Sequence, residues 1–423
     1  MDSVTTPVDS PVLSWPADGL PAPVDTPAAL DAACAALAAG SGPVALDTER
    51  AQSFRYSARA YLIQLRRAGA GTILIDPVAF QDGRTLADLS RVARALDDAE
   101  WILHAATQDL PCLAEIGLRP SRLFDTELAG RLLGYPHVAL GTMLEHFFGV
   151  RLLKEQSAAD WSKRPLPEEM LAYAALDVEL LIPLRDALAA ELDAAGKRDW
   201  AAQEFEWLAR SFPVGPAIDE DRWRHTHGLH GVATRRGLAV VRGLWTARDA
   251  IAREADQAPG RVLIDAAIVE AAATAERLPA GRVMKLGAID GFHRRVARTY
   301  RAEWQAAIDE ALRLPATGLP PLRTSQGGIP APQAWQRVRP AAWERWQAVR
   351  PATLRLAEGC GVPVENLVSP AILRQLVWEP PARLDESAVA EHLAQAGARP
   401  WQVERLAPLI APMLAGAEPA TGG

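Results

Sequence analysis

The sequence predicts an α/β domain with a mixed five-stranded sheet, followed by two all-helical domains. Three short apolar segments rich in β-branched residues follow one another at residues 43–49, 59–67 and 71–77. Helix-like and strand-like segments then alternate up to about residue 126, which is typical of an α/β fold. Beyond residue 237 the apolar positions recur with helical spacing only, so no further sheet is expected.

The first domain is expected at residues 26–212, after a flexible arm at residues 1–25 that is rich in Pro and has no apolar core. Thr26 is a capping residue for a first helix that ends at Gly40. The three apolar segments form a meander of strands. The later elements are expected as a helix at 86–96, a strand at 100–105, a helix from about 108, a strand at 121–126 whose Asp125 caps the next helix, and helices throughout 139–212.

The two helical domains are expected at residues 237–314 and 334–416. Stretches rich in Pro, Gly and polar residues flank them, so linkers are predicted at 213–236 and 315–333 and a frayed tail at 417–423. Three histidines of the first linker could bind a metal, but a solvated linker is the simpler interpretation: His225, His227 and His230.

The composition limits the class of protein. Hydrophobic residues make up 49% of the 423 residues and charged residues 23%, the balance of a soluble globular protein. The net charge of −7 does not indicate a nucleic-acid partner, although it leaves room for local basic surface. Cys34, Cys112 and Cys360 are odd in number and widely spaced, which excludes a disulfide framework and favours the reducing cytoplasm. We expect no signal peptide and no membrane span, because no apolar run approaches about 18 residues.

Asp47 and Glu49 stand at the end of the first apolar strand, two residues apart. Residues i and i+2 of a strand point to the same face, so the two carboxylates would lie side by side. Burying unpaired charge costs several kcal/mol, and hard divalent cations satisfy such a pair. The alternative is a polar strand end with two solvated acids.

Three further residues have a chemical and a purely structural interpretation. Asp109 follows another apolar strand and starts a helix, where the helix dipole alone favours an acid. Tyr173 and Asp177 are separated by four positions on an otherwise apolar helix, so they share one helix face. A tyrosine packed in the core and a hydrogen-bonded aspartate would explain that pair equally well.

The combination is more specific than any of its parts. An acid pair on the first strand, an acid after the fourth and a Tyr-x3-Asp pair on a late helix resemble the four-acid 3′→5′ exonucleases of the ribonuclease H-like fold, in the variant that carries Tyr. The variant that carries His would have it at position 172, which is Ala172 here. LDTE, YLIQL, LHAATQDL, LFDTELAGRLLG, AADWSKRPL and YAALDVELLIPL occur in the order of the ribonuclease D family, over about residues 40–200.

This resemblance implies roles for individual residues. The four metal-ligand acids of the family match Asp47, Glu49, Asp109 and Asp177, and Tyr173 matches the residue that orients the attacking water. Four further matches imply substrate contacts near the site: Gln64, His104, Trp161 and Arg164. For His104, a hydrogen-bonded histidine at a strand end is an equal alternative.

The resemblance also implies two divalent cations, Mg²⁺ or Mn²⁺, about 3.5–4 Å apart. With Asp47 as the bridging ligand, the expected activity is hydrolysis of RNA from a single-stranded 3′ end to nucleoside 5′-monophosphates. Processing of transfer-RNA precursors and other stable RNA is the family expectation, with no obligate protein partner. A DNA 3′→5′ exonuclease and an inactive RNA-binding scaffold are the alternatives, since only contacts to the 2′-OH separate RNA from DNA.

The first helical domain resembles the helicase-and-RNase-D C-terminal (HRDC) domain. The marks of that domain here are Pro259, Val262, Leu263, Asp265 and the later Pro279. Its last helix carries four arginines that could follow a phosphate backbone or simply face solvent: Arg294, Arg295, Arg298 and Arg301. The third domain is expected to be a second HRDC-like domain.

Overall fold

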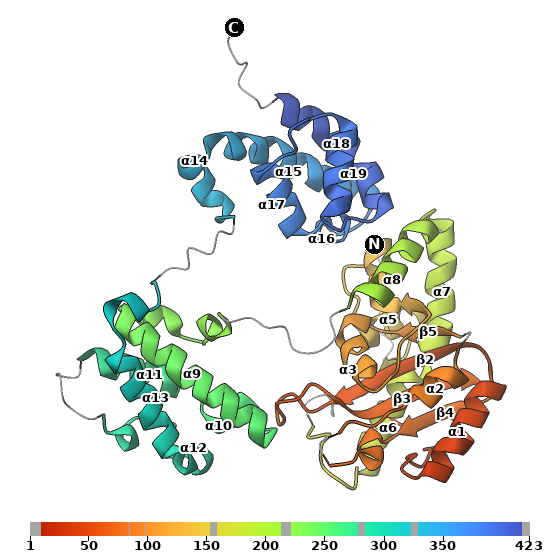
Figure 1. Ribbon diagram of the computed structural model, residues 1–423. Coiled ribbons are helices and arrows are strands. Elements are labelled where there is room, and N and C mark those ends of the chain that lie inside the picture. The colour runs from red at the N-terminus through yellow and green to blue at the C-terminus, as the bar shows by residue number, and fades with distance from the viewer. Residues whose placement is uncertain are drawn as a thin grey trace, which may run out of the picture.

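The computed structural model describes residues 10–83, 85–97, 99–152, 159–212, 221–277, 284–322 and 329–416. Figure 1 shows three regions: a sheet with its helices, a helical region in green and cyan, and a helical region in blue. In the described part of the chain, no helix combines the length and the apolar character that a membrane span needs.

The sheet has the order β4-β3-β2-β5-β6. Its strands are β2 (Ser41–Arg50), β3 (Ala60–Ala68), β4 (Gly71–Ile75), β5 (Glu100–Leu103) and β6 (Arg122–Asp125). The first three are antiparallel neighbours, whereas β5 and β6 run parallel to β2. The predicted mixed five-stranded sheet is therefore confirmed, including its meander.

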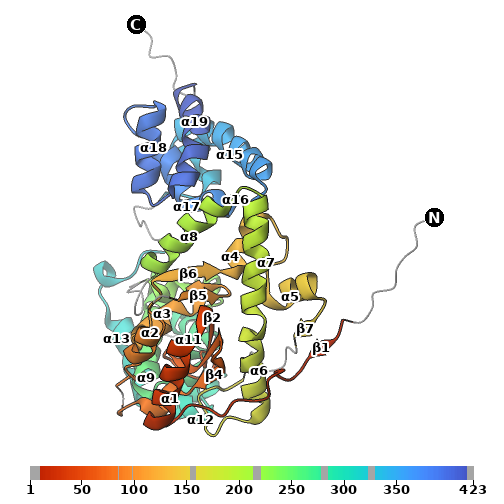
Figure 2. The same ribbon diagram turned by 90° about the vertical axis from the view of Figure 1, so that its right-hand side faces the viewer.

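Helices cover both faces of this sheet (Figure 2). One face carries α1 (Pro27–Ala39), α2 (Ser90–Ala95) and α3 (Leu110–Glu115), whose apolar residues pack with those of the strands in one core. The predicted cap of α1 is confirmed, because Thr26 accepts a hydrogen bond from the amide of Ala29. The other face is covered by α6 (Glu168–Glu179) and by α7 (Leu181–Ala194). The remaining helices of this region are α4 (Thr126–Leu133), α5 (Leu140–Phe148) and α8 (Arg198–Ser211).

Two predictions for this region are wrong in part. The N-terminal arm is attached where it is described, since β1 (Val12–Leu13) pairs in parallel with β7 (Arg151–Leu152) and Val24 forms a bridge with Ile75. The stretch 139–212 is not helical throughout, because β7 and an irregular segment at 159–167 interrupt it. Both features are too short to leave a hydrophobic period in the sequence.

The second region is helical, as predicted. Its helices are α9 (Arg235–Ala255), α10 (Pro259–Val262), α11 (Asp265–Arg277), α12 (Arg295–Thr299) and α13 (Arg301–Arg313). The four arginines at positions 294, 295, 298 and 301 were expected on one last helix, but Tyr300 separates α12 from α13, so they do not share a helix. Pro279 lies outside the described residues.

The third region is helical too. It consists of α14 (Trp335–Val338), α15 (Pro340–Cys360), α16 (Val364–Leu367), α17 (Pro370–Trp378), α18 (Glu386–Gln395) and α19 (Pro400–Gly416). Short 3₁₀ helices connect the elements of all three regions at Pro77–Phe80, Ala106–Gln108, Arg222–His225, Leu229–Gly231, Leu286–Ala288, Ala316–Gly318 and Pro332–Ala334.

The predicted linkers are shorter than expected. Trp223 is 2% exposed and packs with Val232 in the core of the second region. Arg235 donates hydrogen bonds to the carbonyls of Leu319 and Pro320, which holds the start of the second predicted linker on that region. A buried aromatic residue among polar ones leaves no periodic signal, which explains the error. Residues 213–220, 323–328 and 417–423 lie outside the described residues.

The second and third regions join the first in different ways. The third shares one continuous apolar core with α4, α7 and α8, and Trp200 stacks on Trp401 with ring centroids 4.6 Å apart. Inside this joint the carboxylate of Glu204 accepts hydrogen bonds from Trp401 and Arg399, each 2.8 Å long.

The second region contacts the loop that follows β2. Phe54 accepts a backbone hydrogen bond from Ala258 (3.0 Å), Ser57 donates its amide to Asp256 (2.9 Å) and Tyr56 donates its hydroxyl to Asp249 (3.0 Å). This joint is mainly polar, and it begins a few residues after the acid pair of β2.

Candidate active site

The acid pair of β2 lies on the sheet face that α6 covers. In the ladder with β3, Asp47 is opposite Gln64 and Glu49 is opposite Leu62. α6 crosses this face and brings Asp177 to it, so carboxylate oxygens of Asp47, Glu49 and Asp177 lie within 4.8 Å of one another. Three of the four predicted acids therefore converge at one point.

The fourth acid stands beside this group. Asp109 is 3% exposed and precedes α3, and its Oδ1 accepts a hydrogen bond of 2.6 Å from Thr48 Oγ1. It does not belong to the set of oxygens within 4.8 Å of one another, but its charge acts on the other three acids. Thr48, which the sequence reasoning missed, lies between the two acids of β2 and so links the strand to Asp109.

The four buried carboxylates repel one another, so cations are needed for them to be ionised together. Burial, followed by the charges of the neighbouring acids, raises the pKa values of Asp47 and Glu49 well above their usual range. Burial, with the charge of Asp109, raises the pKa of Asp177 to about 7, and burial raises that of Asp109 to about 6 against the hydrogen bond from Thr48. Among the described residues no Lys or Arg forms an ion pair with these four carboxylates. The all-oxygen donor set thus fits hard divalent cations.

Tyr173 lies one helical turn before Asp177, at the edge of the same cluster. Burial and the charges of Asp177, Glu49 and Asp47 raise the pKa of its phenol, so the hydroxyl keeps its proton at neutral pH. Its ring packs near Trp161, with centroids 6.3 Å apart. The phenol is therefore a neutral hydrogen-bonding group beside four acids.

Gln64 and Trp161, two of the predicted substrate-contacting residues, lie inside the fold. Both side chains are 0% exposed, so neither is placed to make the direct contact with a substrate that was expected of it. Neither the amide atoms of Gln64 nor Nε1 of Trp161 has a hydrogen-bond partner in the described structure.

Arg164 and His104 have structural partners. Arg164 forms a two-pronged ion pair with Asp76 (2.5 and 2.7 Å) and donates to the carbonyl of Tyr61, which fixes the segment before α6 against the sheet. His104 Nδ1 lies 2.9 Å from Thr126 Oγ1, and burial lowers the pKa of the imidazole to about 4, so it is neutral. Of the two interpretations of His104, the structure therefore favours a hydrogen-bonded histidine at a strand end.

Asp125 holds the loop before Asp109, a role that the sequence reasoning missed. Asp125 caps α4 as predicted, accepting from the amides of Glu127 and Leu128. Its carboxylate also accepts from the amides of Ala105 and Ala106, which supports the left-handed conformation of Ala105 (φ 61°). Only the tertiary fold brings these amides to Asp125, so no local sequence pattern indicates this contact.

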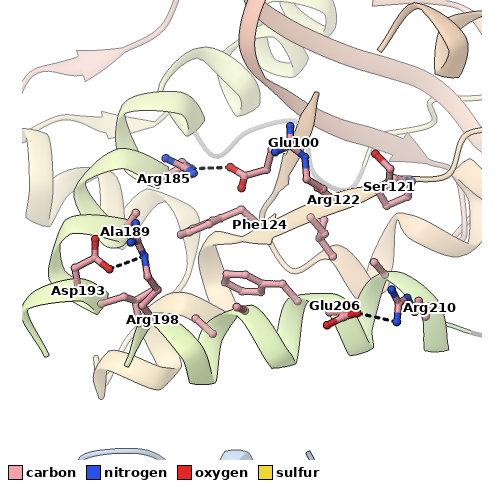
Figure 3. A pocket seen from close by; sticks show the side chains of 17 residues that line it. Glu100, Ser121, Arg122, Phe124, Arg185, Ala189, Asp193, Arg198, Glu206 and Arg210 are labelled. Carbon is pink, nitrogen blue, oxygen red and sulfur yellow. Dashed lines mark hydrogen bonds and ion pairs between the residues drawn. The ribbon is translucent and has the colours of Figure 1, made fainter. Parts of the chain in front are cut away.

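Two other places in the described part of the chain do not hold a comparable group of acids. A pocket of about 640 Å³ lies between β6, α7 and α8. Figure 3 shows the side chains that line it. Three of its arginines are paired with acids, as in the ion pairs of Arg185 with Glu100, Arg198 with Asp193 and Arg210 with Glu206. It contains none of the predicted site residues. The three linker histidines form no metal-ligand group among the residues that the structure describes.

Comparisons with known proteins agree with this geometry. Residues 21–193 match the family model described as 3′-5′ exonuclease, residues 237–308 the HRDC domain, and residues 328–414 the 3′ to 5′ exonuclease C-terminal domain. The third region thus matches a model of its own rather than that of HRDC.

Individual relatives match over most of the chain. A ribonuclease D of Acidiphilium cryptum is 33% identical over 72% of this chain and 79% of its own length. A crystal structure of a protein from Bifidobacterium adolescentis is 37% identical with a TM-score of 0.84, covering 96% of this chain and 100% of that one. The structure of Escherichia coli RNase D is 26% identical with a TM-score of 0.65, covering 93% and 98%.

The raised pKa values predict how the metal-free protein responds to pH. The folded acids hold protons that the unfolded chain releases above about pH 4, so stability is lost as the pH rises from about 4 through about 7. We expect the melting temperature to fall by a few degrees between about pH 5 and about pH 8, and excess Mn²⁺ to remove most of this fall.

Thermal melts with and without Mn²⁺ measure this effect. Asp177→Asn is the control, because it keeps every titrating group outside the cluster and relieves the repulsion inside it. A fall of equal size in the variant and the parent protein would show that the cluster does not cause it.

Proposed function

The chain belongs to the ribonuclease D family and is a hydrolase with 3′→5′ exonuclease chemistry, and on this basis we propose that it acts on RNA with a single-stranded 3′ end. The convergence of the carboxylates of Asp47, Glu49 and Asp177, with Tyr173 beside them, carries the proposal. RNA is favoured over DNA because the similar Escherichia coli RNase D is described as an exoribonuclease involved in structured RNA processing. The proposed products are nucleoside 5′-monophosphates, and the proposed role is the maturation of transfer-RNA and other stable RNA 3′ ends.

The four acids would hold two divalent cations, Mg²⁺ or Mn²⁺. When bound, such a pair supplies a water of lowered pKa and relief of charge on the leaving oxygen. Asp47, Glu49 and Asp177 are close enough to share one ion, while Asp109, held by Thr48, stands where it would support the second. The acids would thus serve as the ligands that hold the cations in place.

Tyr173 would orient the attacking water. Its hydroxyl is protonated, so it can accept a hydrogen bond from the water or donate one to a phosphate oxygen. Its ring is fixed by the contact with Trp161 and by α6, so the hydroxyl needs little reordering before the reaction.

A cleft between the first and second regions suits the strand that leads to the 3′ end. It measures about 970 Å³ and is lined by the loop after β2, by α3 and by α9. Gln52 lines both this cleft and the small pocket that contains Glu49, so the two spaces adjoin. The half-buried ring of Trp245 faces the cleft, with the exposed guanidinium of Arg222 6.0 Å from its centroid. Aromatic faces beside arginines bind single-stranded bases and phosphates without strong sequence preference.

The direct test is release of labelled mononucleotides from the 3′ end of matched RNA and DNA oligomers. We expect release to require Mg²⁺ or Mn²⁺, to stop with a chelator and to be faster on RNA. Faster hydrolysis of the DNA oligomer would favour a DNA exonuclease, and RNA binding without release would indicate an inactive scaffold.

Asp47→Ala and Asp177→Ala should each abolish turnover. Their metal-free melting temperatures should be unchanged or higher, because one of several mutually repelling buried acids is removed. Steady-state rates and thermal melts measure both effects. The matched control is Asp199→Ala, on the exposed side of α8, which should behave like the parent protein. Near-normal activity of either site variant would refute the assignment of the acids.

Tyr173→Phe should lower kcat by about 10²-fold or more and leave KM largely unchanged, because the phenol acts on the water rather than on binding. The control Tyr300→Phe makes the same chemical change in the second region, away from the acids. An unchanged kcat in the Tyr173 variant would remove this residue from the mechanism.

Trp245→Ala should raise KM for a long single-stranded RNA by roughly 10-fold, since stacking contributes about 1–3 kcal/mol per base. Hydrolysis of a dinucleotide should be unaffected, because it is too short to reach the cleft. Trp207→Ala, which removes a 43% exposed tryptophan from α8, is the control. Equal losses on both substrates would argue against the cleft as the path of the strand.

A further inference from the structure

Gln64 is a buried amide without a partner. Its side chain is 0% exposed, and neither Oε1 nor Nε2 forms a hydrogen bond within the described structure. Leaving a buried donor or acceptor unpaired is destabilising, so polar side chains in the interior nearly always have a hydrogen-bond partner. An unpaired amide on an interior strand of a sheet therefore points to a partner that is present only in the working protein.

The position of Gln64 in the sheet limits what that partner is. On one side it is in register with Asp47 of β2, and on the other with Leu74 of β4. Cross-strand neighbours on one face have Cβ atoms about 4.5–5.5 Å apart. Of the two cross-strand neighbours, Asp47 alone has a polar side chain.

The next polar residue on the same strand face shows a satisfied arrangement. Arg66 donates to the hydroxyl of its own cross-strand neighbour Thr72 (2.6 Å) and lies 3.7 Å from the carboxylate of Glu179 on α6. Polar groups at this interface between β3 and α6 can thus be paired across the strands. Gln64 differs in that its polar neighbour is one of the predicted metal ligands.

We propose that Gln64 is a positioning residue for the metal centre, whose amide holds the Asp47 carboxylate in the orientation that binds the cations. This rests on the proposed function of the acid cluster. A carboxylate that ligates a metal through one oxygen keeps lone pairs for a donor, and the Nε2 group of Gln64 would supply one directly or through one buried water. Removal of such outer partners typically costs 10–100-fold in metal affinity.

The test measures metal binding without RNA or turnover. Gln64→Met keeps an unbranched side chain of similar length and removes the amide, so the fold should be kept. We expect the Mn²⁺ dissociation constant, measured by calorimetric titration, to rise about 10-fold or more. The metal-free melting temperature should stay the same or rise, because an unpaired buried amide has been removed.

Leu62→Met is the matched control, because Leu62 lies two positions away on the same strand, opposite Glu49, and is also fully buried. It should leave Mn²⁺ binding unchanged. Gln64→Leu is the second variant if the methionine variant does not fold.

The outcomes separate this inference from the proposed function. If the parent protein binds Mn²⁺ and degrades RNA but Gln64→Met binds Mn²⁺ equally well, the inference alone is overturned. A variant with a lower metal-free melting temperature and normal Mn²⁺ affinity would also overturn it, since that pattern belongs to a buried structural water. Failure of the parent protein to bind Mn²⁺ would overturn the metal centre itself, and this inference with it.

Discussion

Mutual repulsion among buried carboxylates is the constraint on which the rest of this structure depends. Asp47, Glu49 and Asp177 bring oxygens within 4.8 Å of one another, and Asp109 adds its charge from the side. Such a group is unstable in ionised form unless cations enter it. The sheet, α3 and α6 must therefore be stable enough without the cluster to hold four acids in place. The two apolar cores on either side of the sheet supply that stability.

The central part of this arrangement could be predicted from the sequence because it follows from local periodicity. The two-residue spacing of Asp47 and Glu49 fixes their common face whatever the tertiary fold, and the four-residue spacing of Tyr173 and Asp177 does the same on a helix. The strands of the meander are long enough to show their pattern. The periodicity does not predict that the strand face with Asp47 and the helix face with Asp177 meet. That prediction came from the family resemblance.

The remaining features depend on contacts between distant segments and could not be read from the sequence. In the sequence Thr48 has no feature that separates it from other strand residues. Only the fold brings its Oγ1 within 2.6 Å of Oδ1 of Asp109. Gln64 was expected at the substrate, yet its position on the interior strand β3 under α6 buries it completely. The pairing of Val12 and Leu13 with β7 involves two residues on each side, too few for any pattern. In each of these cases the tertiary structure determines the contact, and the local sequence pattern that could have indicated it is weak or absent.

The contrast between the two joints has a consequence for how the molecule will behave in different solutions. The third region is joined to α8 through stacked tryptophans and a shared apolar core, an association that sulfate and similar salts strengthen. The second region is joined to the loop after β2 through hydrogen bonds and charges at partly exposed positions, which dissolved ions screen over about 8–10 Å at ordinary ionic strength. A rising concentration of sulfate should thus loosen the joint with the second region while tightening the joint with the third. The width of the cleft between the first and second regions then becomes a property of the medium as well as of the chain.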